Sequence, residues 1–274
     1  MGIFDTLKRA FAASGRNNVS ILSAGVAYYA FLAMVPLLAA TVLTYGLIAD
    51  PTMVAKDVST LANNLPQAAA EIIGDQLQSV VKSSGTAKGL GLLLAIALAL
   101  FGARNGAGAV ITAISLAFND SEQRGFLRAN LLALAITVGA VVGMGVVAAA
   151  MTATTALTSL IPNLSGAGKL FGQVVPHVIL AGLGGIGAAW LYRTVPNNTQ
   201  PAFREVVPGA LLASSGLVLL TLAFSFYVAN FGSYNATYGS LGAVVVLLTW
   251  LYLSAYVLLF GAEIAAVSTQ DKPA

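Results

Sequence analysis

Residues 89–119 read GLGLLLAIALALFGARNGAGAVITAISLAFN, and this stretch decides the fold class. It is long and apolar enough to cross a bilayer, whose hydrocarbon core is spanned by about 20 helical residues. Arg104 and Asn105 nevertheless lie near its middle. A charge at that depth costs about 3 kcal/mol on insertion scales. We therefore expect other helices or a wet cavity to surround Arg104, with the nearby glycines allowing close helix contact.

The composition of the whole chain also indicates a membrane protein. Of its 274 residues, 58% are hydrophobic and only 8% are charged, whereas about 25% of the residues in a soluble domain are charged. The apolar stretches are far longer than the roughly 10 residues of a membrane strand, which favours helices over a barrel. The predicted fold class is an all-α polytopic membrane protein with six transmembrane helices and an external amphipathic helical pair between spans 1 and 2.

The six predicted spans form a single transmembrane domain over residues 1–274. They cover about 20–48, 89–118, 129–160, 170–192, 206–230 and 239–267. Between the first two, residues 50–87 carry several charges and place apolar residues at helical spacing, which predicts two amphipathic helices separated near Pro66.

The start of the chain predicts a short amphipathic helix at the membrane surface, over residues 4–18. Its apolar side carries Phe4, Leu7 and Phe11, and its basic side carries Lys8, Arg9 and Arg16.

The distribution of lysine and arginine predicts the orientation. Six spans place both termini on one side, together with eight basic residues, and leave four basic residues on the other side. Because basic residues concentrate on the cytoplasmic side, we expect both termini in the cytoplasm and residues 50–87 in the periplasm.

Several chemistries are excluded by residue type. The chain has no cysteine, so disulfides and cysteine metal sites are ruled out. Its single histidine, His177, cannot form a histidine-rich metal site. No basic run resembles a nucleic-acid footprint. We expect no cofactor, no metal and no nucleic-acid partner.

Four segments together resemble the YihY/BrkB family of bacterial inner-membrane proteins, historically called the ribonuclease BN family. They are AGVAYYAFLAMVPLL in the first span, the AFND–EQRGF turn, YRTVPNN–FREVVPGALLAS before the fifth span, and YNATYGSLGAVVVLLTWLYLSAYVLLFGAEIAAV at the end. The resemblance covers nearly the whole chain. It implies a six-helix inner-membrane protein, and the family has no firmly settled biochemical activity.

The old family name would imply a tRNA-processing nuclease, but the residues argue against one. Nuclease chemistry needs clustered carboxylates or histidines that bind metals, or an acid and a base at the phosphate. Here the acidic residues are scattered over opposite faces of the membrane. We therefore expect that the protein is not an enzyme and that ribonuclease activity is absent.

Arg104 is the principal candidate for a binding residue, because an ionisable residue within a membrane is a functional hypothesis by default. It could contact an anionic headgroup or a transported anion, or it could be a structural arginine. Glu263 lies with Thr249, Tyr252 and Tyr256 near one face of the last span, by 3.6-residue periodicity. That face could line a path or could be a seam between helices. The candidate substrate-binding residues are Arg104, Asn105, Tyr28, Tyr29, Tyr252, Tyr256 and Glu263.

A second set consists of residues that shape or bend helices. Pro36 removes the hydrogen bond to the carbonyl of Leu32, so we expect a kink in the first span. The candidate structural or gating residues are Pro36, Gly102, Gly106, Pro208, Gly209, Tyr238 and Gly239.

Transport or export of an envelope lipid or another amphipathic anion is the leading functional hypothesis. The alternatives are a cation/proton antiporter and a non-transporting membrane scaffold. The antiporter is the weaker of these, because no acidic residue is expected at the membrane midplane. The expected partners are membrane lipids, and a homo-oligomer is left open.

Overall fold

The computed structural model describes residues 2–48, 85–120, 125–160, 166–199, 201–231 and 240–270. Within these ranges the protein consists of seven helices and contains no strand, which confirms the all-helical prediction. The amphipathic pair predicted over residues 50–87 lies outside the described residues, apart from 85–87, which begin helix α5. Tyr238 and Gly239 also lie outside them.

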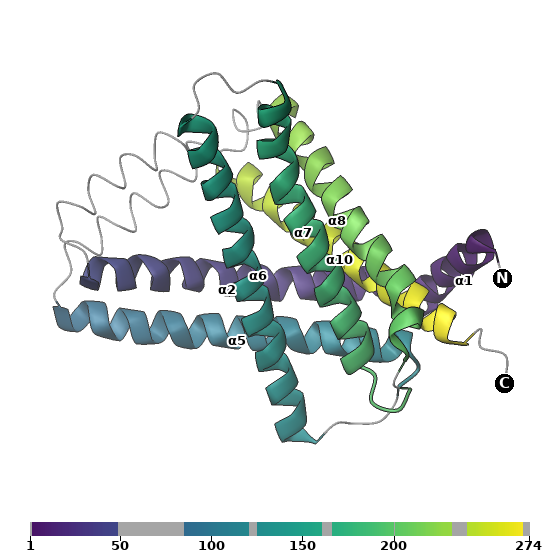
Figure 1. Cartoon of the computed structure of the whole chain (residues 1–274). Helices are drawn as coiled ribbons and strands as arrows, with labels where there is room; N and C mark the ends of the chain where they lie inside the picture. Colours follow the sequence, from purple (N-terminus) through teal and green to yellow (C-terminus); the bar gives the residue numbers. More distant parts are fainter. Residues whose placement is uncertain are drawn as a thin grey trace. The chain divides into compact units, whose positions relative to one another are not determined.

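Among the described residues a short helix precedes six long ones, and Figure 1 shows their arrangement within the chain. The helices are α1 (Ile3–Arg16), α2 (Val19–Ile48), α5 (Gly85–Ala117), α6 (Phe126–Leu160), α7 (Gly166–Thr194), α8 (Phe203–Phe231) and α10 (Ser240–Gln270).

Each of the six predicted spans coincides with one of the long helices. Among the described residues, three helices contain segments long and apolar enough to cross a membrane: Leu90–Ala117, Phe203–Tyr227 and Val244–Gln270. Shorter apolar segments, Val19–Met34 and Leu127–Ala140, lie in α2 and α6. That α2, α6 and α7 also cross the membrane stays a prediction.

The chain divides into two compact units. Unit 1 comprises Met1–Val26, Ala107–Ala229 and Tyr252–Ala274, and unit 2 comprises Ala27–Gly106 and Asn230–Leu251. The single transmembrane domain therefore stays a prediction, and each unit is described by itself.

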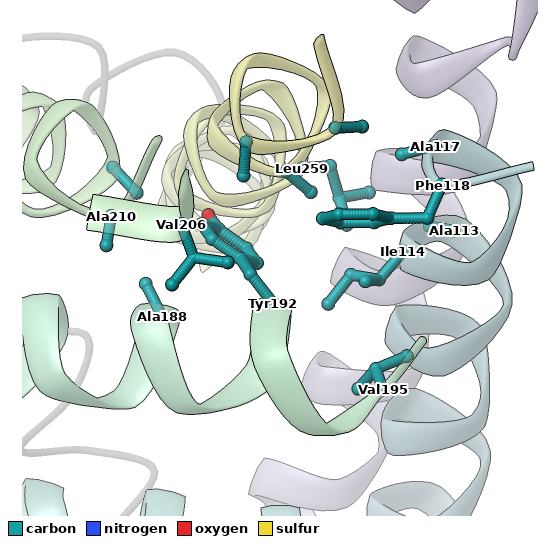
Figure 2. Packing of buried hydrophobic residues seen from close by; sticks show 14 of the residues in the cluster. Ala113, Ile114, Ala117, Phe118, Ala188, Tyr192, Val195, Val206, Ala210 and Leu259 are labelled. Carbon is teal, nitrogen blue, oxygen red and sulfur yellow. The ribbon is translucent and has the colours of Figure 1, made fainter. Parts of the chain in front are cut away.

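The core of unit 1 is built where α5, α7, α8 and α10 converge (Figure 2). Ile114 of α5, Tyr192 of α7 and Val206 of α8 are all fully buried, and Leu259 of α10 is 2% exposed. Most of the remaining core residues are alanines. Such small side chains let helix backbones approach closely, which is how helices associate in a membrane without a hydrophobic driving force between them.

The closest backbone approach in this core is between Gly209 of α8 and Gly261 of α10. A Cβ atom added to Gly209 would overlap the Gly261 carbonyl oxygen, and one added to Gly261 would lie 2.6 Å from the Tyr192 hydroxyl oxygen. That hydroxyl donates a hydrogen bond of 2.5 Å to the carbonyl of Leu258. Only glycine fits at both positions, so Gly209 has a packing role, and its gating role stays a prediction.

In unit 2, α2 and α5 run side by side (Figure 1). A Cβ atom added to Gly102 would lie 2.8 Å from the backbone nitrogen of Ala33, and one added to Gly106 would lie 3.5 Å from the Cβ atom of Tyr29. The two glycines therefore define the face of α5 that packs on α2. Helix α2 continues through Pro36, and the predicted kink there stays a prediction.

Candidate functional site

Arg104 lies on the exposed face of α5 within unit 2. Residues of a helix follow one another at about 100°, so Arg104, two positions from both Gly102 and Gly106, points away from the face that packs on α2. Its side chain is exposed. Helix α2 therefore does not cover Arg104, and the expectation that other helices or a wet cavity surround it stays a prediction.

The neighbours of Arg104 on this face are large apolar side chains. Leu93 is 67% exposed, Leu100 is 55% exposed and Phe101 is 61% exposed. All three fall within roughly 60° of Arg104 around the helix axis. We name Leu93, Leu100, Phe101 and Arg104 the α5 outer face. It combines one guanidinium with an otherwise apolar surface.

The depth of Arg104 follows from its position in the span. It lies 14 positions after Leu90 and 13 before Ala117. At 1.5 Å per residue, it is about 20 Å from either end of the span. A bilayer core is about 30 Å thick, so a span centred in the membrane places Arg104 near mid-depth.

The other unit 2 candidates lie close to Arg104 in the sequence or along α2. Arg104 donates a hydrogen bond from Nη1 to Asn105 Oδ1 at 3.3 Å. The rings of Tyr28 and Tyr29 meet edge to face, with centroids 5.5 Å apart. Tyr28 is 56% exposed, whereas Tyr29 contacts α5 at Gly106.

Glu263 is the buried acidic residue of α10, in unit 1. Its side chain is 1% exposed. Asn17 Nδ2, at the corner between α1 and α2, donates a hydrogen bond of 2.8 Å to Glu263 Oε1. Arg16 lies near enough for its positive charge to act on the carboxylate. Because a buried charge needs a partner, these contacts explain how the helix accommodates Glu263.

The corner that carries Asn17 is a tight turn. Asn18 adopts a left-handed backbone conformation with φ of 53°, which asparagine tolerates better than most residues. The preceding N–H group of Asn17 caps the end of α1 on the Ala13 carbonyl at 2.9 Å. This turn fixes the Asn17 side chain where it reaches α10.

The tyrosines of α10 continue the same side of the helix. The hydroxyl groups of Tyr252 and Ser20 share a hydrogen bond of 2.8 Å. The rings of Tyr252 and Tyr256 lie 6.4 Å apart, and Tyr256 stacks on Phe260 at 6.2 Å. Glu263 thus bonds to the turn between α1 and α2, and Tyr252 bonds to the first turn of α2, as residues of a seam between helices would.

The seven candidate substrate-binding residues fall in different units. Arg104, Asn105, Tyr28 and Tyr29 belong to unit 2, whereas Tyr252, Tyr256 and Glu263 belong to unit 1. Their participation in one site stays a prediction. Of the structural candidates in unit 1, Gly209 is buried and Pro208 is exposed.

Several contact residues were not anticipated from the sequence. They are Asn17, Ser20, Tyr192, Gly261 and Asp120. Asp120 accepts hydrogen bonds from the backbone N–H groups of Asn197 and Asn198, the latter at 3.4 Å, and so joins the turn after α5 to the loop after α7. The sequence signal for such contacts was limited to polar residues at helix ends. Partners that are distant in sequence leave no local pattern.

The part of the chain that the structure describes contains no group of three or more histidine, cysteine, aspartate or glutamate residues placed to hold a metal ion. That the protein is not an enzyme stays a prediction.

Similarity to known proteins extends over almost the full length. The family model described as Virulence factor BrkB matches residues 10–274. YfkH of Bacillus subtilis, named a ribonuclease-like protein, is 29% identical over 97% of this chain and 96% of its own length. A UPF0761 membrane protein of Pseudoalteromonas translucida is 27% identical over 91% of this chain and 81% of its own. No solved structure matches.

Proposed function

The chain belongs to the BrkB family of membrane proteins, and on this premise we propose that it transports an envelope lipid or another amphipathic anion, with Arg104 as the contact for the anionic group. The proposal includes an inner-membrane location with both termini in the cytoplasm. Asn105 would assist Arg104 in binding, and Tyr28 would line the same route.

The single observation that carries the proposal is the exposure of Arg104 on the apolar α5 outer face. A positive charge at mid-depth is unfavourable in a bilayer, and an anionic headgroup beside the guanidinium would offset part of that cost. A guanidinium presents a planar fork of donors that matches phosphate and carboxylate groups. The acyl chains of such a cargo would pack on Leu93, Leu100 and Phe101, which are exposed on the same face.

A non-transporting scaffold is the second candidate, and the α10 seam favours it. Glu263 bonds to Asn17 between α1 and α2, and Tyr252 bonds to Ser20 in the first turn of α2, which supports a role of these polar side chains in helix packing. The antiporter receives less support, because the buried carboxylate of Glu263 is used in this same seam.

The test compares Arg104→Gln and Arg104→Lys with the unaltered protein in proteoliposomes. The measurement is transbilayer movement of a fluorescent phosphatidylglycerol, with fluorescent phosphatidylcholine as the neutral comparison. Hydrogen bonds to charged groups contribute about 1.5–3 kcal/mol, so Arg104→Gln should slow the anionic lipid roughly tenfold or more. Arg104→Lys should retain part of the activity, because the charge remains while the fork is lost.

Arg193→Gln is the matched control, since Arg193 is also an exposed arginine but lies in the last turn of α7. It should leave movement of both lipids unchanged. Thermal stability of each variant in detergent shows whether the protein still folds. Unchanged movement of phosphatidylglycerol in a stable Arg104→Gln protein would refute the cargo contact and leave the scaffold as the better proposal.

A further inference from the structure

Helix α1 presents two different sides, one packed on the protein and one exposed. Ala10 is fully buried, and Leu7 packs with it against Ile264 and Val267 of α10. Phe4 is 79% exposed and Phe11 is 68% exposed. The sequence placed Leu7 on the same side as these two phenylalanines, whereas in the structure Leu7 contacts the protein and the phenylalanines do not share its environment.

The contacts of α1 fix its depth relative to the α10 span. Ile264 and Val267 lie in the last two turns of the segment Val244–Gln270, which has 27 residues. At 1.5 Å per residue this segment is about 40 Å long, roughly 10 Å more than a bilayer core. Its end therefore reaches the boundary between acyl chains and headgroups. Because α1 packs on those turns, it lies at the same level.

A second contact holds the other end of α1 at this level. The hydrogen bond from Asn17 to Glu263, 2.8 Å long, fixes the end of α1 one turn before Val267. Both residues of this contact lie within unit 1, so the contact itself does not depend on how the two units are arranged.

The exposed side of α1 combines aromatic and cationic residues. At about 100° per residue, Phe4, Lys8 and Phe11 lie on one side of the helix. The helix carries three basic side chains and one acidic side chain, Asp5, which gives it a net charge of +2. Lys8 and Arg16 are both exposed.

We propose that the exposed side of α1 binds the surface of an anionic lipid leaflet, with Phe4 and Phe11 between the acyl chains and Lys8 and Arg16 at the headgroups. Helices that lie in the membrane interface bury their apolar side chains at the acyl boundary, and long basic side chains beside them extend their charged ends to the headgroups. The positive charge is complementary to anionic headgroups, and the depth set by α10 brings α1 to them. This surface is separate from the α5 outer face and does not depend on the proposed transport.

The first test locates the Phe11 position in the full-length protein. Trp190 and Trp250 are replaced by Phe, and Phe11→Trp supplies the reporter. The control is Ala12→Trp, at an exposed position that lies about 100° farther round the helix. The protein is reconstituted in vesicles of phosphatidylcholine and phosphatidylglycerol, which together present an anionic surface. Fluorescence is quenched by brominated acyl chains from the lipid side or by iodide from water.

We expect brominated lipid to quench the tryptophan at position 11 at least twofold more than the tryptophan at position 12, and iodide to show the opposite order. Quenching of both by iodide alone would place the helix in water and overturn the proposal. Protection of position 11 from both quenchers would show that protein covers this side, for example a second copy of the chain, and would also overturn it.

The second test concerns headgroup charge. The measured quantity is a ratio for the Phe11→Trp reporter. It compares quenching by brominated phosphatidylglycerol with quenching by brominated phosphatidylcholine. The ratio should exceed one, and Lys8→Gln should lower it by up to about fivefold, since one cation near an anionic surface contributes about 1 kcal/mol. Arg204→Gln, which alters an exposed arginine of α8, should leave it unchanged. A ratio of one in the Phe11→Trp protein would refute anionic selectivity.

Discussion

Replacing Gly209 with alanine should destabilise the protein, although alanine is the better helix former. The new Cβ atom would overlap the Gly261 carbonyl oxygen and would lie 3.0 Å from both the backbone nitrogen and the Cβ atom of Ala265. Carbon contacts are optimal at about 3.5–4.0 Å, so α8 and α10 must separate by on the order of 1 Å. Because the obstructing atoms belong to backbone, no side-chain rotation can relieve the overlap.

The expected cost follows from two opposing effects. Overpacking a core costs about 1–3 kcal/mol, and obstruction by backbone places Gly209→Ala at the upper end. The change from glycine to alanine within a helix returns about 1 kcal/mol. The net loss is about 2 kcal/mol, which corresponds to a decrease in Tm of roughly 4–8 °C for a chain of this size.

The matched control is Gly187→Ala in α7, where an added Cβ atom would meet nothing within 4 Å. It should gain helix propensity without overlap and should unfold at the same or a higher temperature. Thermal unfolding in detergent, followed by the fluorescence of Trp190 and Trp250, compares the two variants. If Gly209→Ala were as stable as Gly187→Ala, the close approach of α8 and α10 would be wrong.

Three further predictions concern polar contacts and topology. Asn17→Ala should cost about 1–3 kcal/mol of unfolding free energy because it removes a donor to the buried Glu263 carboxylate. Glu263→Gln keeps an acceptor for Asn17 and should cost less. Equal losses of stability in thermal unfolding would contradict this. Asp120→Ala should speed proteolysis of the loop after α7 because two backbone N–H groups lose their acceptor, and Asp120→Asn should not. Single cysteines at Gln67 and Asn198 should react with impermeant maleimide from the periplasm and from the cytoplasm respectively, and reaction of both from one side would refute the six-span topology.

The positions of the helices could be predicted from the sequence because long apolar stretches specify them. The predicted first span, 20–48, and the helix α2, Val19–Ile48, differ by one residue. This accuracy arises because a bilayer requires every backbone group to be bonded within its own helix. Hydrophobicity alone therefore locates a helix in a chain with so few charges.

The face that a helix presents was harder to predict. The cost of a charge in lipid predicts that other helices or a wet cavity surround Arg104, and the structure shows that α2 is not one of those helices, because Gly102 and Gly106 are the residues that face it. Two glycines four residues apart form the flat surface that packs on α2, and Arg104, midway between them, must lie on the other side. The spacing needed for this conclusion is present in the sequence.

Contacts between distant parts of the chain could not be predicted. The sequence singled out Glu263 but offered no reason to pair it with Asn17, since 246 residues separate them. Tyr192 and Gly261 also acquire their roles only when α7 and α10 meet. Local periodicity shows which side of a helix is polar, whereas the identity of the partner depends on how the helices assemble.

The attachment of α1 to α10 has a consequence for the order of biosynthesis. Helix α1 leaves the ribosome well before the residues of α10 that hold it, Glu263, Ile264 and Val267. Ala10 and Asn17 therefore stay uncovered until α10 has been inserted. A chain truncated before Glu263 cannot complete this step, so docking of α1 reports that synthesis has passed α10.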